Sequence, residues 1–469
     1  MPRTPATPIA ERVRRLLAED PAFAAAAPSK QVAATIEAAD GDLVATIAAA
    51  MAGYADRPAL ARRARRVVRD PSSGALVHEH GQEVETVSYA QLWQRAGAFA
   101  ATLHEARTEA DSHGAALPGA ALPGAALPGA GLPAAEASGG SEAVDDFVAV
   151  LGFTSIDYAV IDLGCQRAGS VVVPLSTGVP AAQLLPILAE TRPRTLAADV
   201  ESLGTAVELV REAGVVGEVV VFDYDDRLDS HREALAAAEG GLSGRARVRT
   251  LDAELARGTG LPEPPRQRAD GERLASLIYT SGSTGEPKGA IYTRAMITRI
   301  WQNSRNGIRN AGSSADLPVP TIVLHYMPMS HVNGRSWLVS GLSSGGIGFF
   351  TATRDMSTLL EDISLARPTV LSLVPRICDM VRQRFRLAQL SARATGAASA
   401  DAAAEAATRD GLLGGRIVCA LCGSAPLSAE TKDFMEQLLG CPITDCYGST
   451  ETTRPVVVNT RVMRPPVLE

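Results

Sequence analysis

The chain has 469 residues, 46% of them hydrophobic and 21% charged, which is typical of a globular protein large enough for two or three domains. Its 45 basic and 52 acidic residues give a net charge of -7, and aromatic residues are scarce, so neither nucleic acid nor an anionic membrane is an expected partner. No apolar stretch is long enough to predict a membrane span, and the N-terminus lacks the apolar core of a secretion signal, so we expect a cytoplasmic protein.

The N-terminal residues 8–54 are predicted to be helical. Ile9, Val13 and Leu16 recur at helical spacing and therefore lie on one face, and residues 42–55 carry a similar apolar stripe. This pattern predicts a helical segment over residues 1–54, ahead of the rest of the chain.

Residues 84–108 predict a short strand followed by a helix. From residue 145 onward, short apolar runs alternate with helical segments, which is the pattern of βαβ units and a largely parallel sheet. The runs are continuous rather than alternating, as expected for strands buried on both faces. The predicted strands include these segments: 147–152, 170–176, 217–223, 276–280, 321–329, 368–375 and 415–423.

A repeat interrupts this pattern at residues 114–133, which read GAALPGAALPGAALPGAGLP. A proline in every fifth position forbids a continuous helix, and the segment has little that can form a core. We therefore expect a low-complexity surface insertion at about residues 105–143. A proline-rich ligand segment is the less favoured alternative, because the repeat contains no P-x-x-P.

The six cysteines give no strong metal signal. Cys419 and Cys422 lie in an apolar strand-like run, no histidine is near, and the spacing to Cys441 and Cys446 fits no zinc finger or ribbon well. Buried free thiols are the expected state, and a zinc site is the less favoured alternative.

Residues 276–293, SLIYTSGSTGEPKGAIYT, have the composition of a phosphate-binding loop, but two common nucleotide motifs do not fit. A Walker loop beginning at Gly282 would need glycine where Pro287 stands, and serine or threonine at Gly289. The Rossmann pattern also fails, since Gly282, Gly285 and Gly289 are spaced three and four residues apart.

A hairpin-like phosphate loop remains, and a plain glycine- and serine-rich surface loop is the alternative. Hydroxyl groups, glycines that let the backbone approach, and one lysine suit a polyphosphate that is held and then released. These groups belong to Ser281, Gly282, Ser283, Thr284, Gly285 and Lys288.

The string TSGSTGEPKG at 280–289 resembles the signature of the acyl-adenylate-forming superfamily, which includes acyl-CoA synthetases, adenylation domains of peptide synthetases and luciferases. Two further stretches follow in the family's order: CGSAPLS at 422–428 resembles its G-x-x-P-L segment, and DCYGSTETT at 445–453 resembles its Y-G-x-T-E motif. Four other segments resemble the adenylation domain of bacterial carboxylic acid reductases: AEDPAFAAAAP, GYADRPAL, LHYMPMSHVNGR and RPPV.

The resemblance implies an α/β fold, namely the large N-terminal domain of adenylate-forming enzymes, with mostly parallel sheets flanked by helices. It assigns residues 55–469 to the AMP-binding core domain. It also implies a reaction in which a carboxylate attacks the α-phosphate of ATP, giving an acyl-adenylate and pyrophosphate. Such a site must neutralise phosphate charge and hold the reactants in line.

The same resemblance implies roles for individual residues. Glu451 is the candidate magnesium ligand, Thr450 reaches the α-phosphate, and His331 lies near the reacting carboxylate. An ordinary surface carboxylate and a structural histidine are the alternatives for Glu451 and His331, and His325 is expected to be structural. The residues implied to bind ATP or AMP are Thr280, Ser281, Gly282, Ser283, Thr284, Gly285, Lys288, Gly423, Ser424, Ala425, Pro426, Asp445, Tyr447, Gly448, Ser449 and Thr450.

The acyl pocket is expected to be small and apolar, which suits an aryl or aliphatic acid. We expect it to draw on residues near His331, on residues 341–350, on Val374 and Pro375, and on CGSAP at 422–426, with no evident cation nearby to pair with a second carboxylate. In the full-length enzyme the resemblance implies phosphopantetheine and NADPH as further cofactors and a carrier domain in cis as partner.

The chain departs from the family at its C-terminal end. The family continues with a segment whose aspartate holds the ribose and with a small domain that supplies a lysine, whereas residues 455–469 contain neither aspartate nor lysine. We therefore expect a fragment that lacks the small C-terminal domain, the carrier and the reductase, or else a severely impaired enzyme. Three hypotheses follow: a truncated reductase adenylation domain, a fatty-acyl-CoA ligase, and an inactive nucleotide-binding fragment.

Overall fold

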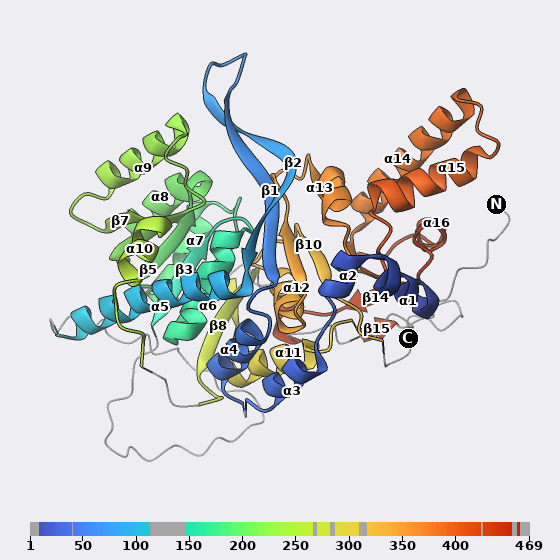
Figure 1. Cartoon of the computed structure of the whole chain (residues 1–469). Helices are drawn as coiled ribbons and strands as arrows, with labels where there is room; N and C mark the ends of the chain where they lie inside the picture. The colour runs from blue at the N-terminus through green and yellow to red at the C-terminus, as the bar shows by residue number, and fades with distance from the viewer. Residues whose placement is uncertain are drawn as a thin grey trace.

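The computed structural model describes residues 9–39, 41–112, 146–265, 270–281, 287–308, 317–423, 425–452 and 457–459. Within these ranges the chain forms two mostly parallel sheets flanked by helices, which confirms the predicted α/β class (Figure 1). Among the helices that the structure describes, none is both long enough and apolar enough to cross a bilayer.

The eight-stranded sheet A has the order β15-β14-β13-β12-β10-β11-β1-β2. Its strands are β1 (Pro58–Arg69), β2 (Leu76–Ser88), β10 (Ile322–His325), β11 (Ile347–Phe350), β12 (Val370–Leu373), β13 (Cys419–Cys422), β14 (Ile443–Tyr447) and β15 (Val457–Asn459). The two edge strands, β2 and β15, pair antiparallel with their neighbours, and the inner pairs are parallel.

The seven-stranded sheet B has the order β7-β6-β5-β3-β4-β8-β9. Its strands are β3 (Phe147–Leu151), β4 (Val171–Leu175), β5 (Thr195–Asp199), β6 (Glu218–Phe222), β7 (Arg247–Thr250), β8 (Leu274–Ser281) and β9 (Pro287–Thr293). All pairs are parallel except β8 with β9, which form an antiparallel hairpin.

Helices flank both sheets. Those of the first part of the chain are α1 (Ile9–Glu19), α2 (Pro21–Ala25), α3 (Lys30–Glu37), α4 (Leu43–Gly53), α5 (Tyr89–Ser112), α6 (Ile156–Ala168), α7 (Ala181–Thr191), α8 (Leu203–Ala213), α9 (Asp229–Gly241) and α10 (Leu251–Gly258). Those of the second part are α11 (Arg294–Ser304), α12 (Val332–Ser343), α13 (Leu359–Ala366), α14 (Pro375–Ala394), α15 (Ala400–Ala406) and α16 (Ala429–Leu439).

The strands of sheet B are buried on both faces, as their continuous apolar runs predict. Because successive side chains of a strand point to opposite faces, Val148 and Val150 of β3 enter one core while Ala149 and Leu151 enter another. The first core also contains residues of α4, α5 and α6 together with Leu60 and other residues of sheet A. This shared core joins the two halves of the molecule.

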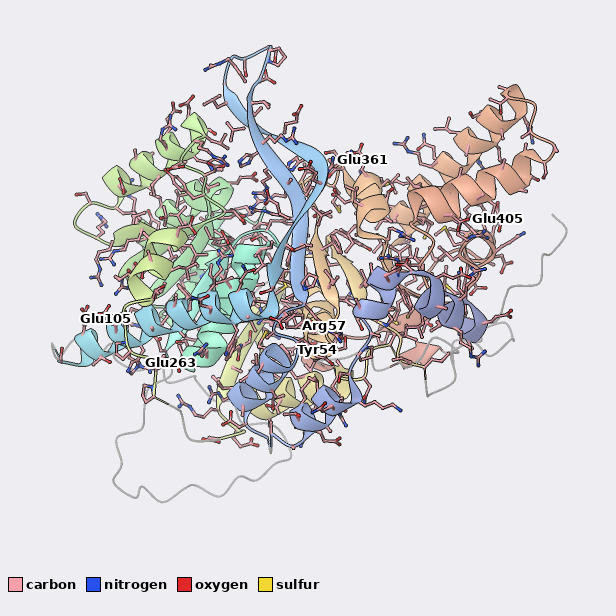
Figure 2. The ribbon with its side chains drawn as sticks, in the orientation of Figure 1. Tyr54, Arg57, Glu105, Glu263, Glu361 and Glu405 are labelled. Carbon is pink, nitrogen blue, oxygen red and sulfur yellow. The ribbon has the colours of Figure 1, made fainter. Side chains whose placement is uncertain are left out.

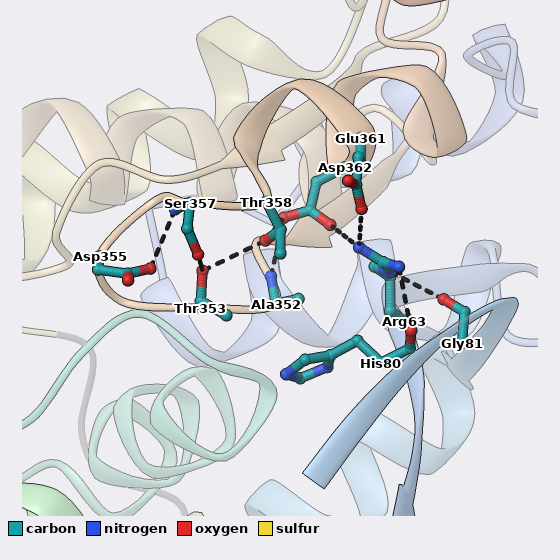
Figure 3. Close-up of polar contacts among 10 residues, drawn as sticks. All are labelled: Arg63, His80, Gly81, Ala352, Thr353, Asp355, Ser357, Thr358, Glu361 and Asp362. Carbon is teal, nitrogen blue, oxygen red and sulfur yellow. Dashed lines mark hydrogen bonds and ion pairs between the residues drawn. The ribbon is translucent and has the colours of Figure 1, made fainter. Parts of the chain in front are cut away.

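Strand β1 is the main element that the sequence pattern did not predict. Its arginine-rich sequence PALARRARRVVR lacks an apolar run, yet it pairs with β11 on one side and with β2 on the other. Figure 3 shows how one of its arginines is accommodated: Arg63 donates to the backbone carbonyls of His80 and Gly81 and pairs with Glu361 at 3.0 Å and Asp362 at 3.5 Å. A buried charge is tolerated where such partners compensate it.

The start of the predicted insertion needs correction. Helix α5 continues to Ser112, so residues 105–112 are helical, and Glu105 near its end forms an ion pair with Arg257 of α10 (Figure 2). The helix therefore extends four residues beyond the predicted end at residue 108. The rest of the predicted insertion, including the repeat, lies outside the described residues.

The N-terminal helices pack against the remainder of the chain. Tyr54, at the end of α4, lies beside Arg57 (Figure 2), whose guanidinium is 4.7 Å from the tyrosine ring and donates to the backbone carbonyls of Ala27 and Gly345. The division into residues 1–54 and 55–469 remains a prediction.

All six cysteines are free in the structure, and none forms a disulfide. Burial raises the pKa of Cys378 and Cys419 to about 12, so these thiols stay protonated. They are inert packing residues at neutral pH, because the thiolate is the reactive form.

Candidate active site

The carboxyl edge of sheet A collects most of the predicted site residues. Strands β10, β12, β13 and β14 run parallel, with Val323 opposite Val370, Val370 opposite Cys419, and Cys422 opposite Asp445. The loops that follow these strands therefore leave from the same edge, where α/β proteins commonly bind ligands. His331 and Gly423 come after β10 and β13, and Tyr447 is the last residue of β14.

The loop that carries His331 is held by its own backbone and by Thr154. The Thr154 hydroxyl donates to the Met327 carbonyl at 2.9 Å and accepts from the Met329 amide at 3.0 Å, and the His331 amide donates to the Pro328 carbonyl at 3.1 Å. His331 precedes the first turn of α12, and its side chain is exposed and makes no capping hydrogen bond. Its ring is therefore available to a ligand at this edge.

His325 has the structural role that the sequence predicts. It is the last residue of β10, is 2% exposed and stacks on Phe350 with ring centroids 5.1 Å apart. Burial lowers the pKa of His325 to about 4, so the ring stays neutral near physiological pH.

Gly334, in the first turn of α12, lies against the turn that precedes the helix. A Cβ atom there would overlap the carbonyl oxygen of Pro328 and lie 2.8 Å from that of Met327. We therefore expect Gly334→Ala to lower the free energy of unfolding by about 1–3 kcal/mol, although alanine normally favours a helix. Gly341→Ala in the same helix is the matched control, because its nearest non-local atom would be 4.0 Å away. Urea denaturation measures both variants, and equal stability of the two would contradict the expectation.

Arg335 fastens the same helix to α6. Its guanidinium pairs with the carboxylate of Asp162, and the two side chains are only 11% and 12% exposed. The Arg335 amide also donates to the His331 carbonyl at 3.3 Å, so the ion pair anchors the turn that follows His331. The sequence analysis did not single out either residue.

A cavity of about 40 Å³ lies beside this ion pair. Its walls come from α6, α11, α12 and the β8–β9 hairpin and are mostly aliphatic, with Trp301, Tyr292 and Arg335 among the lining residues. Of the predicted pocket residues, Leu342 and residues close to His331, such as Val332, line this cavity. Residues 347–350 run into sheet A as β11 instead. Arg335 is a cation in the wall of this cavity, and Asp162 neutralises it.

The predicted phosphate loop connects β8 and β9. Thr280 lies opposite Lys288 and Ser281 opposite Pro287, and the Thr280 hydroxyl donates to the Lys288 carbonyl at 3.5 Å. This antiparallel pairing gives the hairpin that the sequence predicts, and the Lys288 side chain is exposed. The remaining loop residues of the prediction lie outside the described residues: Gly282, Ser283, Thr284 and Gly285.

The motif Y-G-S-T-E begins at Tyr447, the last residue of β14, and runs into a 3₁₀ turn, Thr450–Thr452. The ring of Tyr447 is 71% exposed, which leaves its face free to cover a planar ligand such as adenine. The carboxylate of Glu451 is exposed, and a hydrogen bond from Ser449 lowers the pKa of its carboxyl group. It is therefore anionic at neutral pH.

These groups fit MgATP chemically. Magnesium is commonly held by one or two carboxylates together with phosphate oxygens and water. Glu451 supplies one exposed anionic oxygen donor, and no cluster of three or more metal-binding side chains occurs among the residues the structure describes. Bound magnesium would neutralise phosphate charge and polarise the reacting phosphate.

Gly423, Ala425 and Pro426 follow β13, on the same edge of sheet A as the end of β14. Ala425 and Pro426 are exposed, and Ser424 lies outside the described residues. Asp445, within β14, accepts from the ammonium group of Lys432 on α16. Part of its carboxylate is therefore already used to hold α16 on the sheet.

Tyr292 is a residue that the sequence analysis missed. It lies on β9, is 3% exposed, and its hydroxyl donates to the backbone carbonyl of Thr450. The only available signal was its apolar neighbours in GAIYT, which predict burial but give no partner.

The family described as AMP-binding enzyme matches residues 141–467. The carboxylic acid reductases of Mycobacterium tuberculosis and Segniliparus rugosus are each 40% identical to the chain, over 464 and 470 residues. Each match covers 98% of this chain and 36% of the relative, so the chain spans about a third of the length of these relatives.

Solved structures show the same similarity to carboxylic acid reductases. The A domain of the carboxylic acid reductase of Segniliparus rugosus, in complex with AMP and a co-purified carboxylic acid, is 38% identical with a TM-score of 0.80, and the match covers 99% of this chain and 68% of that one. The adenylation domain of a carboxylate reductase from Mycobacterium chelonae is 36% identical with a TM-score of 0.79, and the match covers 100% and 69%. The chain belongs to the AMP-binding enzyme family and is similar along nearly its whole length to the adenylation domains of carboxylic acid reductases.

Proposed function

We propose that this chain activates a carboxylic acid with ATP, forming an acyl-adenylate and releasing pyrophosphate, as the first step in the reduction of that acid to an aldehyde. The observation that carries the proposal is the meeting of two motifs. The β8–β9 hairpin, with Lys288, is hydrogen-bonded through Tyr292 to the turn that bears Glu451. A lysine and a carboxylate brought together in this way suit MgATP.

The resemblance to adenylate-forming enzymes supports the following roles for the residues. Lys288 and the hairpin loop hold the β- and γ-phosphates, Glu451 holds magnesium, and Thr450 contacts the α-phosphate. Tyr447 packs on adenine, with Gly423–Pro426 beside it, and His331 lies near the attacking carboxylate. The small cavity beside Arg335 receives the tail of an aryl or aliphatic acid.

The finer parts of the proposal concern the larger protein. Magnesium is the proposed metal, and the cytoplasm is the proposed location. A carrier domain in cis, with its phosphopantetheine, would accept the acyl group, and an NADPH-dependent domain would reduce it. A structure of the joined A and PCP domains of the Segniliparus rugosus reductase, in complex with AMP, supports a carrier in cis.

The test uses the chain with ATP, magnesium and a panel of aliphatic and aromatic acids. We expect carboxylate-dependent pyrophosphate release, or at least calorimetric binding of a non-hydrolysable acyl-adenylate analogue that competes with ATP. Absence of both would overturn the proposal. The alternative is a fatty-acyl-CoA ligase, which is supported by the 26% identity to human long-chain-fatty-acid–CoA ligase 1 over 333 residues. Addition of coenzyme A distinguishes the two functions, because formation of acyl-CoA would favour the ligase.

Lys288→Met is expected to weaken ATP binding about tenfold, the effect of losing one charge-assisted hydrogen bond, and to leave AMP binding unchanged. The difference arises because the lysine is proposed to contact only the β- and γ-phosphates. Calorimetry with the two nucleotides measures it. The chain has three lysines, and the exposed Lys30 of α3 provides the control Lys30→Met, which should affect neither nucleotide. An equal loss of ATP and AMP affinity would contradict the assignment.

A further inference from the structure

The two halves of the proposed nucleotide site stand on different sheets. Lys288 belongs to the β8–β9 hairpin of sheet B, whereas Glu451 follows β14 of sheet A. Tyr292 of β9 spans this junction, because its hydroxyl donates to the Thr450 carbonyl.

The hydrogen bond to the Thr450 carbonyl restricts the backbone that carries the Glu451 side chain. The carbonyl of Thr450 and the amide of Glu451 belong to one planar peptide unit, which also includes the Cα atom of Glu451. A hydrogen bond that fixes this carbonyl therefore fixes the point from which the Glu451 side chain starts. The antiparallel pair of Tyr447 with Val457 holds the β-strands on either side of the turn, so Tyr292 adds a support between them.

The surroundings of Tyr292 keep its hydroxyl a donor. Burial raises the pKa of Tyr292 to about 12. The positive charge of Arg335 lowers this pKa, and the negative charge of Glu451 raises it. The phenol is thus protonated across the physiological range, and its ring also lines the cavity beside Arg335. The same residue contacts both the proposed acyl cavity and the magnesium-bearing turn.

We propose that Tyr292 is a positioning residue for the magnesium carboxylate: its hydroxyl ties the Thr450–Glu451 peptide to the phosphate hairpin, so that Lys288 and Glu451 face one MgATP. This inference rests on the proposed function. Tyr292 lies outside the three sequence motifs, and the inference assigns it to nucleotide binding rather than to the chemistry of the acid.

The variant Tyr292→Phe removes the hydroxyl and keeps the ring. We expect the affinity for ATP in the presence of magnesium to fall about five- to tenfold, as for the loss of one hydrogen bond, with a parallel rise in the KM for MgATP. The KM for the carboxylate should stay unchanged, because the cavity wall is preserved. Hydrogen exchange of a peptide spanning residues 445–452 should become faster in the variant without nucleotide.

Tyr89→Phe is the matched control. The Tyr89 hydroxyl also donates to a backbone carbonyl, that of Gly346 at 2.9 Å, and the side chain is fully buried but lies outside the proposed site. This variant should lose stability without a change in MgATP affinity or in exchange of residues 445–452.

The outcomes separate the two proposals. If the unmodified chain does not bind MgATP, the proposed function fails, and the role of Tyr292 fails with it. If the unmodified chain binds MgATP and Tyr292→Phe matches it in affinity and exchange, the positioning role alone is overturned. Equal effects of Tyr89→Phe and Tyr292→Phe on MgATP affinity would also overturn it, since they would indicate a general loss of stability.

Discussion

Glu451→Gln is expected to reduce carboxylate-dependent pyrophosphate release about 10²- to 10³-fold, the loss typical when one preorganised electrostatic group is removed from a site. Glutamine keeps the size of the side chain but lacks the charge that magnesium requires. The Glu451 carboxyl has a lowered pKa and is exposed, so it is charged and free to bind the ion. Pyrophosphate release and the dependence of ATP affinity on magnesium concentration measure the effect.

The control for this variant is Glu430→Gln on α16. Glu430 is also exposed and also has a lowered carboxyl pKa, in its case because it pairs with Arg382 of α14. Its replacement should leave activity and magnesium dependence unchanged. A Glu451→Gln protein that stays within about threefold of the parent in both measurements would refute the assignment of Glu451 as the metal ligand.

Arg335→Met is expected to lower the free energy of unfolding by about 3–5 kcal/mol, because it leaves the buried carboxylate of Asp162 without its counter-charge. The effect should appear as a shift in the urea midpoint. The double variant with Asp162→Leu should recover most of the loss, since replacing both members of a buried ion pair by apolar residues is often close to neutral.

Arg62→Met provides the comparison at an exposed ion pair. Arg62 and Glu85 are 3.0 Å apart, with side chains 34% and 46% exposed, so its loss should cost at most about 1 kcal/mol. A loss at Arg335 as small as that at Arg62 would show that the α6–α12 ion pair contributes little to holding the helix that follows His331.

Local sequence patterns were sufficient to predict much of the fold. The continuous apolar runs of β3, β4 and β6 predicted strands buried on both faces, and the structure places alternate residues in two cores. Strand β1 was missed because its arginines hide the apolar alternation, and Arg63 is buried only through partners from β2 and α13 that are distant in sequence.

The candidate site also combines features that local sequence predicts with contacts that depend on the fold. The sequence by itself determined the phosphate hairpin, the Y-G-S-T-E turn and the His331 loop, because loop chemistry and spacing are local properties of a chain. Only the tertiary structure decided that Tyr292 joins the first two across the sheets and that Arg335 and Asp162 anchor the third. The physical reason is that these contacts join residues 158 and 173 positions apart, so they depend on how the sheets and helices pack. One sequence read alone records each side chain but not its partner.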